Sequence, residues 1–158
     1  PLSREQFDRI SAYARGVLAR DDLFEERIRA GRIRDCHGDL YSANICLADK
    51  VYIYDCIEFN DRFRYCDVAS DVAFLAMDLD FHDLSDLGAY FIERFGNQSG
   101  DQGLGAMLDF YKCYRAYVRG KIGLFTAADP AVDASVRQAN LEAAARYFRL
   151  ADSYASRG

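Results

Sequence analysis

The sequence has no long apolar run, no basic excess and no signal-peptide pattern at its start, and each absence excludes a class of protein. Its longest uninterrupted apolar run, residues 72–77, is far shorter than the roughly 20 residues that cross a bilayer. Its net charge of −5 argues against a protein that holds nucleic acid through phosphate contacts. We therefore expect neither a membrane nor a nucleic acid as a partner.

Paired cysteine motifs are also missing. The five cysteines are odd in number and contain no C-x-x-C pair. The first four recur every ten residues, which matches no zinc-binding pattern. We expect buried, reduced thiols in a cytoplasmic protein, at Cys36, Cys46, Cys56, Cys66 and Cys113.

The composition predicts one folded domain over residues 1–158. With 158 residues, 51% of them hydrophobic and 14% aromatic, the chain can bury a substantial core. This composition also excludes a disordered tail.

The most distinctive segment is HGDLYSAN at residues 37–44, which is followed by the apolar run VYIY and then by Asp55. Asp39 can accept a hydrogen bond from an alcohol and take its proton. Asn44 and Asp55 offer oxygen ligands of the kind that Mg²⁺ prefers. His37 can hold the loop through hydrogen bonds, and Gly38 allows a tight backbone path. A plain polar turn is the simpler interpretation of His-Gly-Asp alone, but the full spacing favours phosphoryl transfer.

Apolar periodicity predicts a mostly helical protein with a small β-hairpin. The hairpin is expected from residues 45–47 and 51–54, and it would place Asn44 and Asp55 at adjacent strand ends. A short strand is expected over residues 32–36. A capping box at Ser3 and Gln6 predicts a first helix, or a broken pair of helices, that ends at Gly31. Further helices are expected over residues 67–81, 84–95 and 104–125, and from Asp129-Pro130 onward.

These motifs resemble those of the aminoglycoside phosphotransferase and choline kinase group of kinase-like enzymes. The pattern of that group appears here as HGDLYSAN, VYIYD and DVASD, within residues 34–80. The segments IYDCIEFNDRFRYCDVASDVAFLAMDLD and YRAYVRGKIG are also similar to a bacterial aminoglycoside phosphotransferase-like subfamily. Members of this subfamily often carry an additional P-loop nucleotide-kinase-like domain.

The resemblance assigns a role to each motif residue. Asp39 would be the catalytic base, Asn44 and Asp55 the magnesium ligands, and Asp67 the acid that braces the loop. His37 would join Asn44 and Asp55 in the cofactor-binding set. The resemblance also implies ATP and Mg²⁺ as cofactors, a small-molecule hydroxyl as acceptor and a cytoplasmic location.

The resemblance implies an α+β, mostly helical fold: the C-terminal lobe of a kinase-like protein, with a small hairpin carrying the catalytic and metal loops. Such an enzyme also needs an N-terminal lobe with a loop that covers the phosphates. The first 36 residues contain no Gly-rich loop, no V-A-I-K-like strand and no GxxxxGK[ST] motif. We therefore expect the N-terminal nucleotide-binding lobe to be absent from this chain, and that lobe and a fused P-loop domain to be its partners.

Several roles stay open at the level of sequence. Either Asp67 or Asp71 could bury against the loop, or both could simply favour the first turn of a helix. The role of Glu58 is open, because Cys56 and Ile57 precede it where the family has an aromatic residue.

The charge of the acceptor also stays open. Lys112, Arg115 and Arg119 form either a solvated stripe or an anion site. A group of four acids could instead attract a cation: Asp78, Asp80, Asp83 and Asp86.

Two other functions compete with the phosphotransferase interpretation. One is a non-catalytic binding module of the pseudokinase type, or a fragment that pairs with a partner. The other is a metal-dependent phosphohydrolase, which would need more histidine ligands than His37 and His82 supply.

Overall fold

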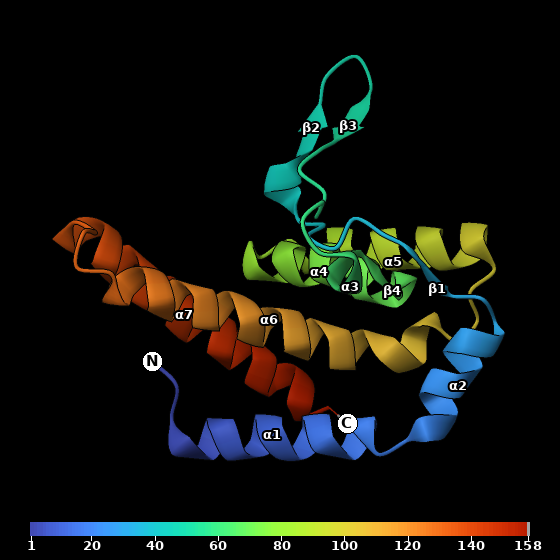
Figure 1. The fold of residues 1–158 in the computed structure, drawn as a ribbon, viewed down its shortest axis with the longest axis horizontal. Helices are drawn as coiled ribbons and strands as arrows, with labels where there is room; N and C mark the ends of the chain where they lie inside the picture. The colour runs from blue at the N-terminus through green and yellow to red at the C-terminus, as the bar shows by residue number, and fades with distance from the viewer. Residues whose placement is uncertain (158) are drawn as a thin grey trace.

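The computed structural model describes residues 1–157, and the chain is α+β and mostly helical, as expected (Figure 1). Its elements, in chain order, are α1 Arg4–Leu18, α2 Asp21–Arg29, β1 Ile33–Asp35, the 3₁₀ turn η1 Ser42–Asn44, β2 Ile45–Leu47, β3 Val51–Ile53, α3 Asp61–Arg64, β4 Tyr65–Asp67, α4 Val68–Phe81, α5 Ser85–Ser99, α6 Leu104–Ala128 and α7 Ala134–Ala155. Within these residues, no helix is both long and apolar enough to cross a membrane.

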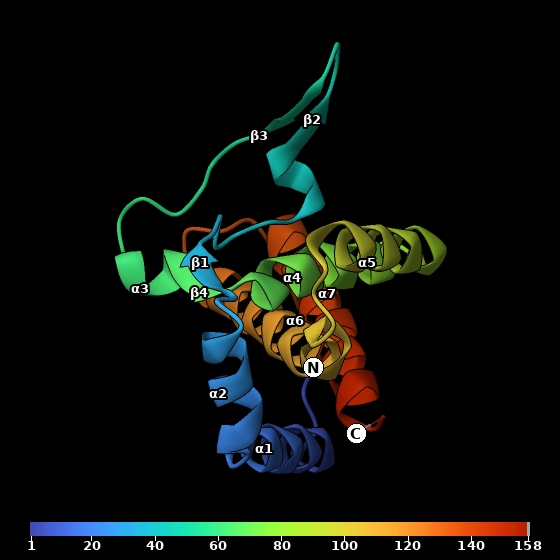
Figure 2. The same cartoon turned by 90° about the vertical axis from the view of Figure 1, so that its right-hand side faces the viewer.

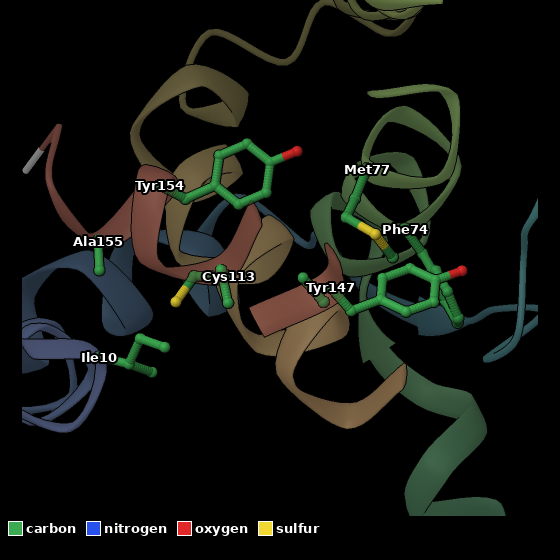
Figure 3. Close-up of a cluster of buried hydrophobic side chains, with 9 residues drawn as sticks. Ile10, Phe74, Met77, Cys113, Tyr147, Tyr154 and Ala155 are labelled. Atoms are coloured by element: carbon green, nitrogen blue, oxygen red, sulfur yellow. The ribbon is translucent and has the colours of Figure 1, made fainter. Parts of the chain in front are cut away.

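The long helix α6 lies in the middle of the molecule. It packs against α4 on one side and α7 on the other, while α5 covers α4 and α1 covers α7 (Figure 1). Figure 3 shows the core formed where these helices meet, with Phe74 and Met77 from α4, Cys113 from α6 and Tyr154 from α7. All four side chains are at most 2% exposed, so this core fixes α4 relative to α6 and α7.

The cysteines divide between this core and the surface. Cys113 is buried, and burial raises the pKa of its thiol to about 12. Cys36 and Cys66 are partly buried in the sheet of β1 and β4. The expectation of burial is wrong for Cys46 and Cys56, which are exposed on the hairpin and the segment that follows it.

The helix starts and ends follow local chemistry in most places. The Ser3–Gln6 capping box is present, and the first helical region is a broken pair, α1 and α2, followed by Gly31 at φ 64°. Helix α5 continues through Gly96 to Ser99 and ends at Gly100, whose φ of 62° suits a left-handed cap.

The start of the last helix was predicted four residues too early. The Asp129 side chain accepts a hydrogen bond from the Ala131 amide at 2.9 Å, which forms a turn instead of a helix cap. Helix α7 begins only after Asp133.

Four short strands form two separate two-stranded sheets. Strands β2 and β3 make the expected hairpin, with Ile45 opposite Ile53, and it projects from the helical body in both views (Figures 1 and 2). Strand β4 was not expected; it pairs antiparallel with β1, placing Ile33 opposite Asp67. This second sheet leads the chain from α2 into the HGD loop, the name used below for residues 37–44.

A buried ion cluster joins α2, the start of α4 and the turn before α6. The Arg27 guanidinium contacts both oxygens of Asp67 at 2.8 and 2.7 Å, and Asp101 at 2.8 Å. The three residues are at most 6% exposed. Burial raises the pKa of Asp101, but the hydrogen bonds and charge of Arg27 more than offset this, so the pKa lies below its ordinary value. The cluster therefore orients the start of α4.

Replacing Arg27 should destabilise the fold strongly. Arg27→Ala leaves two buried carboxylates without a counter-charge, and we expect the free energy of unfolding to fall by about 3–5 kcal/mol. Urea unfolding followed by circular dichroism measures this loss. Arg29→Ala is the matched control, because Arg29 is an exposed partner of Glu26 and should cost less than about 1 kcal/mol. Equal small losses in the two variants would contradict the role given to the cluster.

Candidate functional site

Two buried carboxylates of α4 hold the HGD loop near its two ends. Asp71 accepts hydrogen bonds from the backbone amides of His37 at 2.7 Å and Gly38 at 3.1 Å. Asp78 accepts one from the Ser42 amide at 2.9 Å. Asp71 is 6% exposed and Asp78 is 2% exposed. Because they lie two helical turns apart, both face the loop.

The loop-bracing role that the resemblance assigns to Asp67 belongs in the structure to Asp71. Asp67 instead caps α4 by accepting the Ala69 amide at 2.9 Å, and its carboxylate faces Arg27. The next turn of the helix therefore carries the acid that reaches the loop. The contact of Asp78, seven residues further on, was not expected at all.

The backbone of the HGD loop needs glycine at its second position. Gly38 has φ 82° and is buried, and a Cβ atom there would lie 2.9 Å from the Phe63 carbonyl oxygen. The loop is also tied to the following segment, because the Ile57 amide donates to the His37 carbonyl at 3.0 Å. Ile57 and the Phe63 carbonyl therefore lie against the start of the loop.

His37 links the loop to the hairpin. Its Nε2 lies 2.8 Å from the Tyr54 carbonyl oxygen, and its Nδ1 accepts the Asp39 amide at 3.3 Å. Both contacts are satisfied by one neutral tautomer, with the proton on Nε2. The ring thus holds Asp39 on one side and the residue before Asp55 on the other.

The hairpin brings Asn44 and Asp55 to the same end, as the sequence predicted. The Tyr54 amide donates to the Asn44 carbonyl at 3.1 Å, which continues the ladder past the Ile45–Ile53 pair. Asp55 comes directly after this bond and adopts φ 62°, in the left-handed region that non-glycine residues rarely occupy. Strained residues of this kind cluster at ligand sites and active sites.

The Asn44 side chain is buried and oriented. Its amide nitrogen donates to the Asp39 carbonyl oxygen at 3.0 Å. Among residues 1–157 no hydrogen bond to its amide oxygen occurs, which leaves the atom that a magnesium ion prefers without a protein partner.

Asp39 and Asp55 line one open cleft of about 790 Å³. Its other lining residues are Cys56, Ile57, Glu58 and Phe59, so the wall carries three carboxylates and no cation. Asn44 lies beside the cleft, at 4% exposure, and not in its wall. An acidic, open cleft of this kind suits a divalent cation with bound phosphates more than a bare anion.

The donor set fits magnesium better than a transition metal. In the part of the chain that the structure describes, no three His, Cys, Asp or Glu side chains are grouped so that they could hold a metal ion. Magnesium is usually bound by one or two carboxylates plus phosphate oxygens and water, and it does not require such a cage. Asn44 and Asp55 would supply the protein oxygens.

The basic stripe of α6 is largely internal and not a solvated face. Lys112 is 8% exposed and contacts Asp80 at 2.9 Å. Arg115 donates to the Ser70 hydroxyl at 2.9 Å and lies 3.9 Å from Asp71. Arg119, the third member, lies over the Tyr41 ring, 4.8 Å from its centroid.

Comparisons with known proteins give relatives without an assigned activity. The chain is 46% identical over 107 residues to the uncharacterized protein Rv2004c of Mycobacterium tuberculosis, and equally to Mb2027c of Mycobacterium bovis. Each match covers 67% of this chain and 22% of the relative, so the chain spans about a fifth of the length of these curated relatives. No protein-family model and no solved structure matches the chain.

Removing the charge of Asp71 should loosen the HGD loop. In Asp71→Asn, only one of the two side-chain atoms that face the loop is still an oxygen, so the side chain can no longer accept hydrogen bonds from the loop amides with both atoms. We expect a loss of about 1.5–3 kcal/mol in the free energy of unfolding and faster hydrogen exchange at the His37 and Gly38 amides. Asp86→Asn, at an exposed position of α5, is the control and should change neither quantity. Unchanged exchange at both loop amides would rule out the contact described.

Proposed function

We propose that this chain is the helical C-terminal lobe of a kinase-like phosphotransferase, similar to the aminoglycoside phosphotransferase and choline kinase group. The intact enzyme transfers the γ-phosphoryl group of ATP to a hydroxyl of a small molecule. The observation that carries the proposal is the single cleft lined by Asp39 and Asp55, with Asn44 held beside it. The motif spacing and this geometry support the same assignment independently.

Asp39 has the position that a base needs. Its backbone is held by His37 and Asn44, whereas no hydrogen bond to its carboxylate occurs among residues 1–157. The free carboxylate accepts a hydrogen bond from the acceptor hydroxyl and aims its oxygen at the γ-phosphorus. As the new O–P bond forms, Asp39 takes the proton, the β–γ bridging bond breaks and ADP leaves.

Asn44 and Asp55 would hold a magnesium ion at the nucleotide end of the cleft. Such an ion would supply positive charge to neutralise the transferring phosphoryl group. The left-handed backbone of Asp55 turns the chain directly after the hairpin. The buried amide of Asn44 has its nitrogen held by the Asp39 carbonyl, which joins the base and the metal ligand in one unit.

The proposal places the rest of the nucleotide cleft on a second lobe, with a fused P-loop domain as a further partner. The hairpin that carries the candidate site extends away from the helices (Figure 2). Its side chains Leu47, Val51 and Ile53 are 55–78% exposed. This apolar surface provides a contact area for such a lobe. A cytoplasmic location belongs to the same proposal, because the reaction requires ATP.

Asp39→Asn should abolish turnover without unfolding the protein. The substitution keeps the shape but removes the proton acceptor, and we expect a fall in rate of about 10²–10⁴-fold. Labelled ATP and a library of small alcohols, tested with the full-length protein that carries this lobe, give the rate. Asp86→Asn is again the matched control. Near-normal turnover in Asp39→Asn would refute the assignment, and ATP binding without turnover by the unaltered protein would favour a non-catalytic module.

Asp55→Asn should act through magnesium. Losing one charged ligand weakens the ion site, so we expect activity to require at least about tenfold more Mg²⁺. A magnesium titration of the rate at fixed ATP measures the shift. Asp21→Asn on the exposed start of α2 is the control. An unchanged magnesium requirement would remove Asp55 from the ligand set.

A further inference from the structure

A second pocket lies beside the HGD loop, between α4, α6 and α7. Its volume is about 340 Å³, at the lower end of the range for small-molecule sites. Its walls include the aromatic residues Tyr41, Phe81 and Tyr147 and the charged residues Asp78 and Arg119. Asp39 is not in its wall, but Tyr41, two residues further along the HGD loop, is.

Arg119 is the one member of the basic stripe that has no carboxylate partner. In residues 1–157 no Asp or Glu oxygen lies within 4.0 Å of its guanidinium, whereas Lys112 and Arg115 each have such a neighbour. The guanidinium instead lies between two rings, 4.8 Å from the centroid of Tyr41 and 5.7 Å from that of Tyr147. Tyr147 also engages the guanidinium through a side-chain hydrogen bond, and stacking of this kind holds the plane of the arginine so that its other N–H groups can meet a ligand.

Asp39 lies close enough to affect Arg119. Burial lowers the pKa of Arg119, but Tyr147, Tyr41 and Asp39 together outweigh it, so the pKa lies above the ordinary value. The guanidinium is therefore always charged, and it lies near enough to Asp39 for the charge of that carboxylate to act on it. Because no carboxylate oxygen in residues 1–157 lies within 4.0 Å of the guanidinium, an anionic ligand would supply a direct partner for it.

The acidic side chains near this pocket already have partners within the protein. Asp78 accepts the Ser42 amide and lies 3.8 Å from His82. Asp80 contacts Lys112 and accepts the Tyr154 hydroxyl at 2.6 Å. Asp83 pairs with Arg146 at 2.8 Å. Asp78 keeps its negative charge, but the residue is 2% exposed and its carboxylate is directed at the Ser42 amide and His82, which leaves Arg119 as the charged group of the pocket wall that can meet a ligand.

We propose that this pocket binds an anionic alcohol, with its carboxylate or phosphate group on Arg119 and its apolar body against Tyr41, Phe81 and Tyr147. The inference rests on the proposed function, because it names the acceptor whose hydroxyl Asp39 would activate. Arginine suits this role, since its planar fork can pair with two oxygens of a carboxylate or a phosphate.

Matched probes test the charge preference directly. We would titrate the isotope-labelled chain with 4-(hydroxymethyl)benzoate, with 4-(hydroxymethyl)phenyl phosphate and with the neutral 4-(hydroxymethyl)benzamide, following backbone amides and the Arg119 Nε–H group by NMR. At least one anion should bind at least about tenfold more tightly than the amide. Comparing the two anions distinguishes a carboxylate acceptor from a phosphate-bearing one. Equal affinity for all three compounds, or no binding of either anion, overturns the inference.

Variants locate the effect at Arg119. Arg119→Gln should remove the preference for anions, while Arg149→Gln, which removes the same charge from an exposed position of α7, should leave it unchanged. Thermal unfolding of each variant establishes that it is folded, and the comparison of probes on the unaltered chain stands without any variant. A preference for anions retained within about twofold in Arg119→Gln would overturn the assignment.

The two proposals fail in different ways. Asp39→Asn should still bind the anionic probes, because Asp39 acts on the hydroxyl and not on the anion. Anion binding without phosphoryl transfer by the full-length protein would leave this inference standing and refute the proposed function. Phosphoryl transfer to neutral or cationic alcohols alone would support the proposed function and refute the anionic acceptor.

Discussion

The candidate site depends on two carboxylates of one helix, Asp71 and Asp78, whose hydrogen bonds go to backbone amides of the loop. Asp71 and Asp78 lie inside the protein and hold the HGD loop through the amides of His37, Gly38 and Ser42. A buried carboxylate that accepts from N–H groups is stabilised by hydrogen bonds to its charged form. Helix α4 is therefore both part of the core and the support of the loop, so the placement of Asp39 depends on how α4 packs.

Packing fixes α4 in two ways. Its apolar side chains meet α6 and α7 in the core of Figure 3, and its first residues are oriented by the buried pairing of Arg27 with Asp67. Arg27 also contacts Asp101, at the turn before α6, so one guanidinium helps to place the start of α4 and the start of α6. The helices α4, α6 and α7 thus pack tightly against one another beneath the HGD loop, while the β2–β3 hairpin has few contacts beyond the pairing of its own two strands.

The features predicted from sequence were those that depend on nearby residues. The Ser3 capping box and the hairpin with Asn44 at its end follow from local spacing and turn chemistry. Strand β4 was missed because it exists only through pairing with β1, about 30 residues earlier in the chain. Sequence could not choose between Asp67 and Asp71, since the choice depends on where Arg27 lies in the folded chain. The lack of a partner for Arg119 likewise depends on the folded positions of all acids around α6.

The backbone of Asp55 has a consequence for how such a protein can be improved. A residue with a Cβ atom at φ 62° stores of the order of 1 kcal/mol of strain, which glycine would release. A screen for thermal resistance alone would therefore select glycine at this position and discard the charged oxygen proposed to bind the ion. Stability and the proposed ion binding thus make opposite demands on one residue, and any engineered variant of the hairpin has to be judged on both.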